Sequence, residues 1–166
     1  MKPALLAGAV IVALAALSPA AAQDARLSPG VGEMNACDVT KIRTQFATDV
    51  VEVGDDFSTI PHTGNSFKHS GADCVVVTLS AETRIEEDGE LLIQAFVDGN
   101  ACDPGPISFA SGEQETFETH SFTWICSDVS AGRHRLTFRG ECEEIDPLGP
   151  RPDCELGDRT IIVFFD

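Results

Sequence analysis

Basic and aromatic residues are scarce in this sequence. Its 166 residues include 11 Lys and Arg against 27 Asp and Glu, which gives a formal net charge of −16 at pH 7, and they include one Trp and no Tyr. Nucleic acids and anionic membrane surfaces are bound by clusters of Lys and Arg, so we expect neither as a partner. Binding modules that stack sugars on several exposed Trp and Tyr rings are disfavoured as well.

The sequence also lacks the short motifs of the common enzyme classes. It contains no G-x-S-x-G nucleophile elbow, no H-E-x-x-H zinc motif and no phosphate-binding glycine loop. No C-x-x-C pair is present, and the spacing of the four histidines matches no zinc site. Carboxylates are so numerous that a pair at the separation used by glycosidases would arise without selection. Whether the chain is an enzyme is left open, and a non-enzymatic role is favoured.

Only one long apolar run occurs, and it lies at the N-terminus. Lys2 is followed by the uncharged run 4–17 and then by Ser, Pro and Ala residues up to position 22. This order predicts a cleaved secretory signal peptide over residues 1–22, because the run is shorter than the ~20 residues that a membrane-spanning helix needs. We expect residues 23–36 to form an extended lead-in and residues 37–166 to form a single domain, secreted or periplasmic.

Six cysteines follow that N-terminal segment, an even number that predicts disulfides in an exported chain. They are Cys37, Cys74, Cys102, Cys126, Cys142 and Cys154. The acidic segment 140–158 is expected to be a long surface loop, closed at its neck by a Cys142–Cys154 disulfide. It is interpreted either as a recognition surface or as a solubilising flap. For the other four cysteines we prefer Cys37–Cys74 with Cys102–Cys126, while other pairings stay open.

Alternating and β-branched segments, separated by Gly, Pro and Asp, predict about eight or nine strands. The segments are 42–50, 57–60, 66–69, 74–81, 91–97, 107–110, 117–125, 133–139 and 159–165. Asp88-Gly89 lies between two strong strand signals and predicts a β-hairpin. We find no convincing helix. The pattern is typical of an all-β antiparallel β-sandwich or jelly roll.

The strand expected at 133–139 carries a large share of the basic residues. Alternation places Arg133, Arg135 and Arg139 on one face, opposite an apolar face. Guanidinium groups two residues apart on a strand could bind a carboxylate, sulfate or phosphate in bidentate geometry. Alternatively, neighbouring Asp and Glu residues neutralise them across the sheet. In the strand expected at 117–125, alternation sets Phe122 and Trp124 on one face, and we expect both to pack in the core.

Two acidic turns supply oxygen ligands of the kind that calcium prefers. One contains Glu86, Glu87, Asp88 and Glu90, and the other contains Asp98, Asn100 and Asp103. The residue order of an EF-hand is missing, so solvated acidic turns are the preferred explanation. We expect no cofactor, and calcium is kept as the alternative.

Several strand and turn segments together resemble a recurring pattern in uncharacterised exported bacterial β-sandwich proteins. The segments are 74–82, 97–99, 120–124, 131–134 and 159–163. The resemblance covers the chain from about Phe46 to its end. It implies a jelly-roll-like fold, and it attaches neither a function nor a site residue.

Three functional hypotheses follow. The first is an exported, non-enzymatic binding or surface-interaction module, which contacts an unknown extracellular ligand or protein through loops at one end of the sandwich. The second is a hydrolase or lyase that acts on an extracellular polymer through a carboxylate pair. The third is a structural domain of a surface assembly. A carboxylate pair in a cleft would favour the second hypothesis, and an unpaired strand edge or an exposed apolar patch would favour the third.

Overall fold

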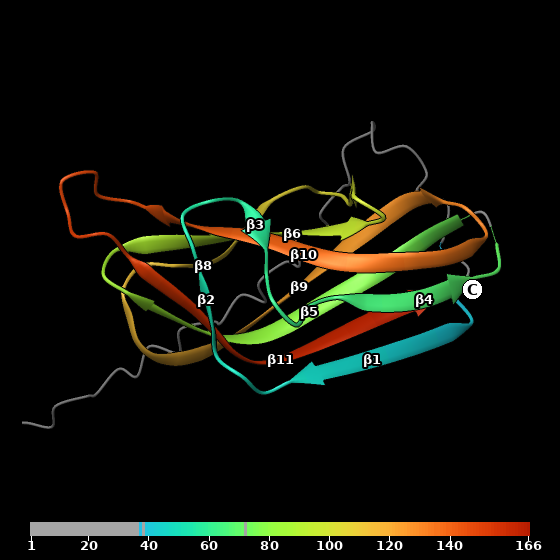
Figure 1. Cartoon of the computed structure of the whole chain (residues 1–166), viewed down its shortest axis with the longest axis horizontal. Coiled ribbons are helices and arrows are strands. Elements are labelled where there is room, and N and C mark those ends of the chain that lie inside the picture. The colour runs from blue at the N-terminus through green and yellow to red at the C-terminus, as the bar shows by residue number, and fades with distance from the viewer. Residues whose placement is uncertain (1–36, 38, 72) are drawn as a thin grey trace, which may run out of the picture. The chain divides into compact units, whose positions relative to one another are not determined.

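The computed structural model describes residue 37, residues 39–71 and residues 73–166, and every regular element among them is a β-strand. The predicted signal peptide and lead-in at 1–36 lie outside the described residues. Eleven strands form two sheets in which all pairings are antiparallel (Figure 1), which confirms the predicted fold class. Within the described part of the chain, no helix has the length and apolar composition needed to cross a membrane.

Each sheet has one strand that runs beside several others. In the first sheet the main strands follow the order β1-β11-β5-β9, and β2 also pairs with β11. Its strands are β1 (Lys41–Ala47), β2 (Val51–Val53), β5 (Asp73–Glu86), β9 (Gln114–Val129) and β11 (Asp153–Phe165). In the second sheet β10 pairs with β3, β4 and β6, while β6 also pairs with β7 and β8. Its strands are β3 (Ser58–Thr59), β4 (Asn65–His69), β6 (Gly89–Val97), β7 (Asn100–Ala101), β8 (Ile107–Ser111) and β10 (Gly132–Glu144).

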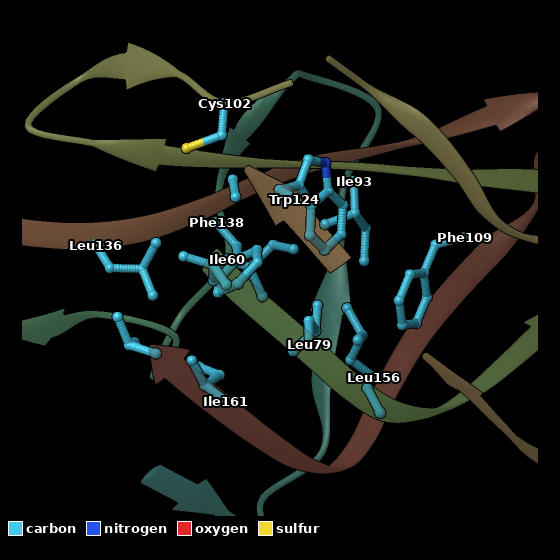
Figure 2. Close-up of a cluster of buried hydrophobic side chains, with 14 of the residues drawn as sticks. Ile60, Leu79, Ile93, Cys102, Phe109, Trp124, Leu136, Phe138, Leu156 and Ile161 are labelled. Atoms are coloured by element: carbon cyan, nitrogen blue, oxygen red, sulfur yellow. The ribbon is translucent and has the colours of Figure 1, made fainter. Parts of the chain in front are cut away.

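The core is built from the inward-facing side chains of both sheets. Figure 2 shows Leu79 of β5, Trp124 of β9 and Phe138 of β10 among these side chains. Trp124 is fully buried, and its Nε1 donates a hydrogen bond to the carbonyl oxygen of Gly105 at 3.0 Å. Phe122 packs against the same core, and the centre of its ring lies 4.8 Å from the centre of the Trp124 ring. The prediction is therefore confirmed for Trp124, whereas Phe122 is half-buried where it packs against the core.

The turn at Asp88-Gly89 does not form the predicted hairpin. β5 pairs with β9 and β11 in the first sheet, whereas β6 pairs with β7, β8 and β10 in the second. The chain crosses from one sheet to the other at this turn, where Glu87 has a left-handed backbone with a φ of 67°. Turn residues indicate a sharp reversal of the chain, but they do not decide which strands pair, because pairing depends on packing across the sandwich.

The predicted loop over 140–158 is wrong in its extent. β10 continues to Glu144 and β11 begins at Asp153, so only residues 145–152 connect them. The acidic side chains of the segment lie mainly on the solvent side of the two strands, while Cys142 and Cys154 are buried. Carboxylates at alternating outward positions are compatible with strands, so an acidic composition does not by itself indicate a loop.

The cysteines form disulfides in the predicted pairs. These are Cys37–Cys74, Cys102–Cys126 and Cys142–Cys154. Cys142 lies on β10 and Cys154 on β11, so their disulfide joins the two sheets. Three disulfides indicate an oxidising environment, such as the periplasm or the extracellular space.

Candidate functional site

The arginine-bearing strand is β10, and its side chains alternate as predicted. Arg133 and Arg135 are exposed, whereas the side chains between and after them are buried. Arg139 is half-buried, and its guanidinium carbon lies 4.4 Å from the centre of the Phe96 ring. The three arginines therefore share the outer face of the second sheet.

Lys68 of β4 extends this group of positive charges. β4 lies beside β10 and pairs with it (Figure 1), and the register sets Lys68 opposite Arg133 and Ser66 opposite Arg135. Lys68 and Ser66 are exposed, while the residues on either side of them are buried. Two cations thus face each other across neighbouring strands, an arrangement that is unfavourable in the absence of an anion.

Two further basic residues come from β1, the edge strand of the first sheet. Lys41 and Arg43 are in register with Phe165 and Val163, whose side chains are buried between the sheets. Because paired residues point to the same side of a sheet, Lys41 and Arg43 point toward the second sheet at the edge of the sandwich. Lys41 Nζ donates a hydrogen bond to Ser70 Oγ at 3.1 Å, just beyond the end of β4.

We name these six residues the basic face. They are Lys41, Arg43, Lys68, Arg133, Arg135 and Arg139. None of them forms an ion pair with a carboxylate among the described residues. The other described Lys and Arg residues all do: Arg84 pairs with Glu86 and Glu155, Arg151 with Asp55, and Arg159 with Asp49. Among the described residues, no carboxylate thus lies within ion-pair distance of the three arginines on β10.

The basic face contains three adjoining hollows. The middle hollow, of about 510 Å³, is lined by Arg43, Lys68 and Arg135 among others. It shares Arg43 and Lys68 with a hollow of about 470 Å³, which includes Lys41 at the edge of the first sheet. It shares Arg135 with a third hollow of about 430 Å³, which ends at Arg139. Neighbouring hollows share lining residues, so the three adjoin one another on the basic face, and we call them together the depression.

Asp98, in the turn between β6 and β7, is a carboxylate that lies among these cations, and the carboxylate of Asp166 lies near Lys41. Asp98 Oδ1 accepts a hydrogen bond from the backbone N–H of Arg135 at 2.8 Å, and Asp98 Oδ2 lies 2.7 Å from His134 Nδ1. The Arg135 N–H holds the pKa of Asp98 below its usual value, burial acts in the opposite direction, and the hydrogen bond and charge of His134 add to the lowering. Asp98 thus fixes the turn against β10 and presents a carboxylate to the hollows.

His134 completes this contact from the inner side of β10. Its Nε2 lies 2.7 Å from the carbonyl oxygen of Ser130, so both ring nitrogens face oxygen acceptors. The two contacts hold the ring in place beneath the basic face.

The lining of the hollows combines charged and neutral polar groups. Hydroxyls of Thr59, Ser66 and Thr137 accompany the cations and Asp98. Guanidinium and ammonium groups bind carboxylates, sulfates and phosphates, whereas hydroxyls and Asp98 can accept hydrogen bonds from hydroxyl groups of a ligand. The arrangement therefore suits a ligand that carries both negative charge and hydroxyl groups.

The acidic turns considered for calcium are not gathered into a metal site in the described part of the chain. No group of three or more His, Cys, Asp or Glu side chains in that part is arranged to hold a metal ion. Glu86 instead pairs with Arg84 at 3.3 Å, and Asp98 contacts His134 and Arg135.

Sequence reasoning identified the arginines of β10 but missed Lys41, Arg43 and Lys68. The alternation of residues 65–69 contains the signal that places Lys68 on an outer face. No local signal places β4 beside β10, or the edge of β1 beside the end of β4. Those neighbours arise from pairing between segments that are far apart in the sequence.

No protein-family profile and no curated protein matches this sequence. Among solved structures, the chain is similar to a VP2 subviral particle of infectious bursal disease virus, with a TM-score of 0.53 and 10% identity over 82% of this chain and 37% of that one. The Gx strain of the same virus gives a TM-score of 0.50 and 11% identity, over 75% and 32% of the two chains. The C-terminal CBM6 of LamC, a marine laminarinase from Zobellia galactanivorans, gives 0.34 and 13% identity, over 73% and 98%. This chain spans about a third of the viral proteins' length, and the likeness to them shows a shared β-sandwich fold alone.

Proposed function

We propose that this chain is an exported, non-enzymatic binding module that holds an anionic ligand on its basic face. One observation carries the proposal: six Lys and Arg residues that form no ion pair with the described carboxylates lie together, in a chain with 27 Asp and Glu. A chain so rich in carboxylates has partners available for its cations, and Arg84, Arg151 and Arg159 have them.

A bound anion would relieve a repulsion between two cations in the free protein. Lys68 and Arg133 lie directly opposite each other, and like charges at such positions destabilise a sheet. An anion between them removes the repulsion and forms charge-assisted hydrogen bonds, which are roughly twice as strong as those between neutral groups. The ligand should therefore also stabilise the folded protein.

The cations of the basic face lie on strands. From the sequence, ligand contacts were instead expected through loops at one end of the sandwich. β10 pairs with β4 over residues 132–136, with β3 at residues 139–140 and with β6 over residues 136–144, and Arg139 is held over the ring of Phe96. Cations on paired strands lose less conformational freedom on binding than cations on loops, so more of the interaction energy appears as affinity.

The proposal is tested by calorimetry with heparin and alginate as anionic probes and dextran as the neutral probe. We compare the wild type with Arg133→Ser/Arg135→Ser, and with Arg84→Ser/Arg151→Ser as a control that removes the same charge outside the basic face. The wild type and the control should bind an anionic probe, and the Arg133/Arg135 variant should bind it about tenfold more weakly or worse. Equal affinity of the two double variants, or no preference over dextran, would overturn the proposal.

Self-assembly through β1 is a second candidate function, and it corresponds to the structural-domain hypothesis. Among the described strands, β1 pairs only with β11, so its other edge is open. Ile42 and Phe46 of this strand are 65% and 71% exposed. Antiparallel pairing of two copies about Thr44 would set Ile42 of each copy opposite Phe46 of the other, and Arg43 opposite Gln45, with no like charges directly opposed.

Sedimentation velocity over a range of concentrations tests this second candidate. The wild type should form dimers, and Phe46→Lys should shift it to monomers because the substitution places a charge opposite Ile42 of the other copy. Leu148→Lys is the matched control, since Leu148 is also an exposed apolar residue but lies outside β1. A wild type that stays monomeric at all concentrations would exclude self-assembly.

A further inference from the structure

The three hollows of the basic face follow one another along and across strands. The first lies at Lys41 and Arg43, the second at Lys68 and the start of β10, and the third ends at Arg139. Arg133 and Arg139 are six residues apart on one strand, which corresponds to ~20 Å. The hollow at Lys41 and Arg43 adds to this extent across the strands, because it also includes Lys68 and Ser70 at the end of β4.

A depression of this length exceeds what one small anion can contact. A single sulfate, phosphate or sugar acid occupies one hollow and leaves the cations of the other two without a partner. A chain with repeated negative groups can satisfy all three, and each additional contact then forms at high effective concentration. The extent of the basic face thus favours a linear polyanion.

The side chains that line the hollows favour one class of polyanion over another. Single-stranded nucleic acids are held largely by stacking of bases on exposed aromatic rings. Of the aromatic rings at the hollows, Phe67 and Phe165 are buried and Phe96 is covered by Arg139. The hydroxyls of Ser66 and Thr137 and the carboxylate of Asp98 instead suit the hydroxyl groups of a sugar chain.

We propose that the basic face binds a linear acidic polysaccharide, which lies along β10 and continues across β4 toward β1. Its carboxylate or sulfate groups occupy the three hollows, and its hydroxyl groups bind the polar side chains between the cations. This inference rests on the proposed anion-binding function and names the class of ligand.

Oligosaccharides of increasing length provide the test. The affinities of the wild type for alginate and heparin fragments, from disaccharide to decasaccharide, are measured by calorimetry. Affinity for at least one series should rise about tenfold or more with length. The series that shows this rise identifies carboxylate or sulfate as the recognised group.

Arg139 lies at one end of the depression and reports whether a ligand spans it. Arg139→Gln should weaken binding of the octasaccharide several-fold and leave binding of the disaccharide unchanged, whereas the control Arg84→Gln should change neither.

If affinity does not depend on length, or if Arg139→Gln weakens binding of both lengths equally, the site takes a small anion. This inference is then overturned and the anion-binding proposal stands. If oligothymidylate of equal charge binds as tightly as the octasaccharide, the polysaccharide class is wrong. If no anionic probe binds, both proposals fail.

Discussion

Among single residues, Arg159 shows how a buried charge can organise a surface connection. Its side chain is fully enclosed, and Nη1 donates hydrogen bonds to the carbonyl oxygens of Asp49 and Gly157 at 2.6 and 2.9 Å. Its Nη2 lies 3.0 Å from Asp49 Oδ1. The guanidinium ties the connection between β1 and β2 to the irregularity in β11 that begins after Leu156. It is a structural cation, in contrast with those of the basic face.

Replacing Arg159 should therefore lower stability. Arg159→Ala leaves the carbonyl oxygens of Asp49 and Gly157 without their donor, and we expect a loss of about 3 kcal/mol in the free energy of unfolding. The control is Arg151→Ala, which breaks an exposed ion pair with Asp55 and should cost less than about 1 kcal/mol. Urea unfolding curves of the three proteins give the comparison, and equal losses would show that Arg159 is not structural.

Asp98 makes stability depend on pH in a defined direction. The Arg135 N–H, with a further contribution from His134, holds the folded-state pKa of Asp98 below its usual value of 3.8. A group whose pKa is lowered by folding contributes stability above the unfolded-state pKa, and the contribution is lost as the pH falls through the folded-state pKa. The contribution of Asp98 is thus complete at pH 7, begins to fall near pH 3.8, and is lost as the pH drops through the lower folded-state pKa.

The variant Asp98→Asn isolates this contribution. Asn tolerates the left-handed backbone at this position, where φ is 51°, but it cannot carry the charge. Thermal melts at pH 7 should show the wild type to be the more stable protein, and the difference should shrink as the pH is lowered toward 3. A difference that stays constant over this range would mean that the charge of Asp98 does not stabilise the fold.

Among the elements, β10 combines the basic face with close packing against its neighbours. A Cβ atom added at Gly140 would lie 2.7 Å from the carbonyl oxygen of Leu92 and 3.1 Å from Ile60 Cδ1. The first of these atoms belongs to the backbone of β6 and cannot move without disturbing the sheet. β10 therefore needs a glycine at this position for its approach to β6.

Gly140→Ala should destabilise the protein by about 1–3 kcal/mol through this overpacking. Gly54→Ala is the matched control, because a Cβ atom there meets no atom within 4 Å. The control should be neutral or slightly stabilising, since alanine restricts the unfolded chain. Chemical denaturation of both variants measures the difference, and a Gly140→Ala protein as stable as the control would show that the two strands can separate at no cost.

The elements also show what could be predicted from the sequence. β5, β9, β10 and β11 were predicted because their alternation and β-branched residues reflect local preference and one-sided burial. The supposed hairpin at Asp88-Gly89 and the supposed loop at 140–158 were wrong, because both required knowledge of which strands pair. The candidate site divides in the same way: Arg133, Arg135 and Arg139 lie on one strand, whereas Lys68 joins them only through the pairing of β4 with β10.

At the scale of the molecule, six of the nine described Lys and Arg residues lie on the basic face of a strongly acidic protein. The net charge of −16 repels a polyanion at long range, so binding depends on short-range contacts with the basic face. We expect affinity for heparin or alginate to fall as salt rises, with a linear relation between the logarithms of affinity and salt concentration. Substitution of Arg133 or Arg135 should reduce that slope by up to about 1. A slope that does not change in these variants would place the ionic contacts elsewhere.

The disulfide between Cys37 and Cys74 determines how the domain would carry a mechanical load. A pull applied upstream of Cys37 would otherwise reach β1 first, and an edge strand that pairs only with β11 among the described strands can be peeled away one hydrogen bond at a time. The disulfide transmits the force instead to the start of β5, which is flanked by β11 and β9. Tension from an N-terminal attachment would therefore bypass β1 and leave the cations of that strand in place while the domain is held under strain.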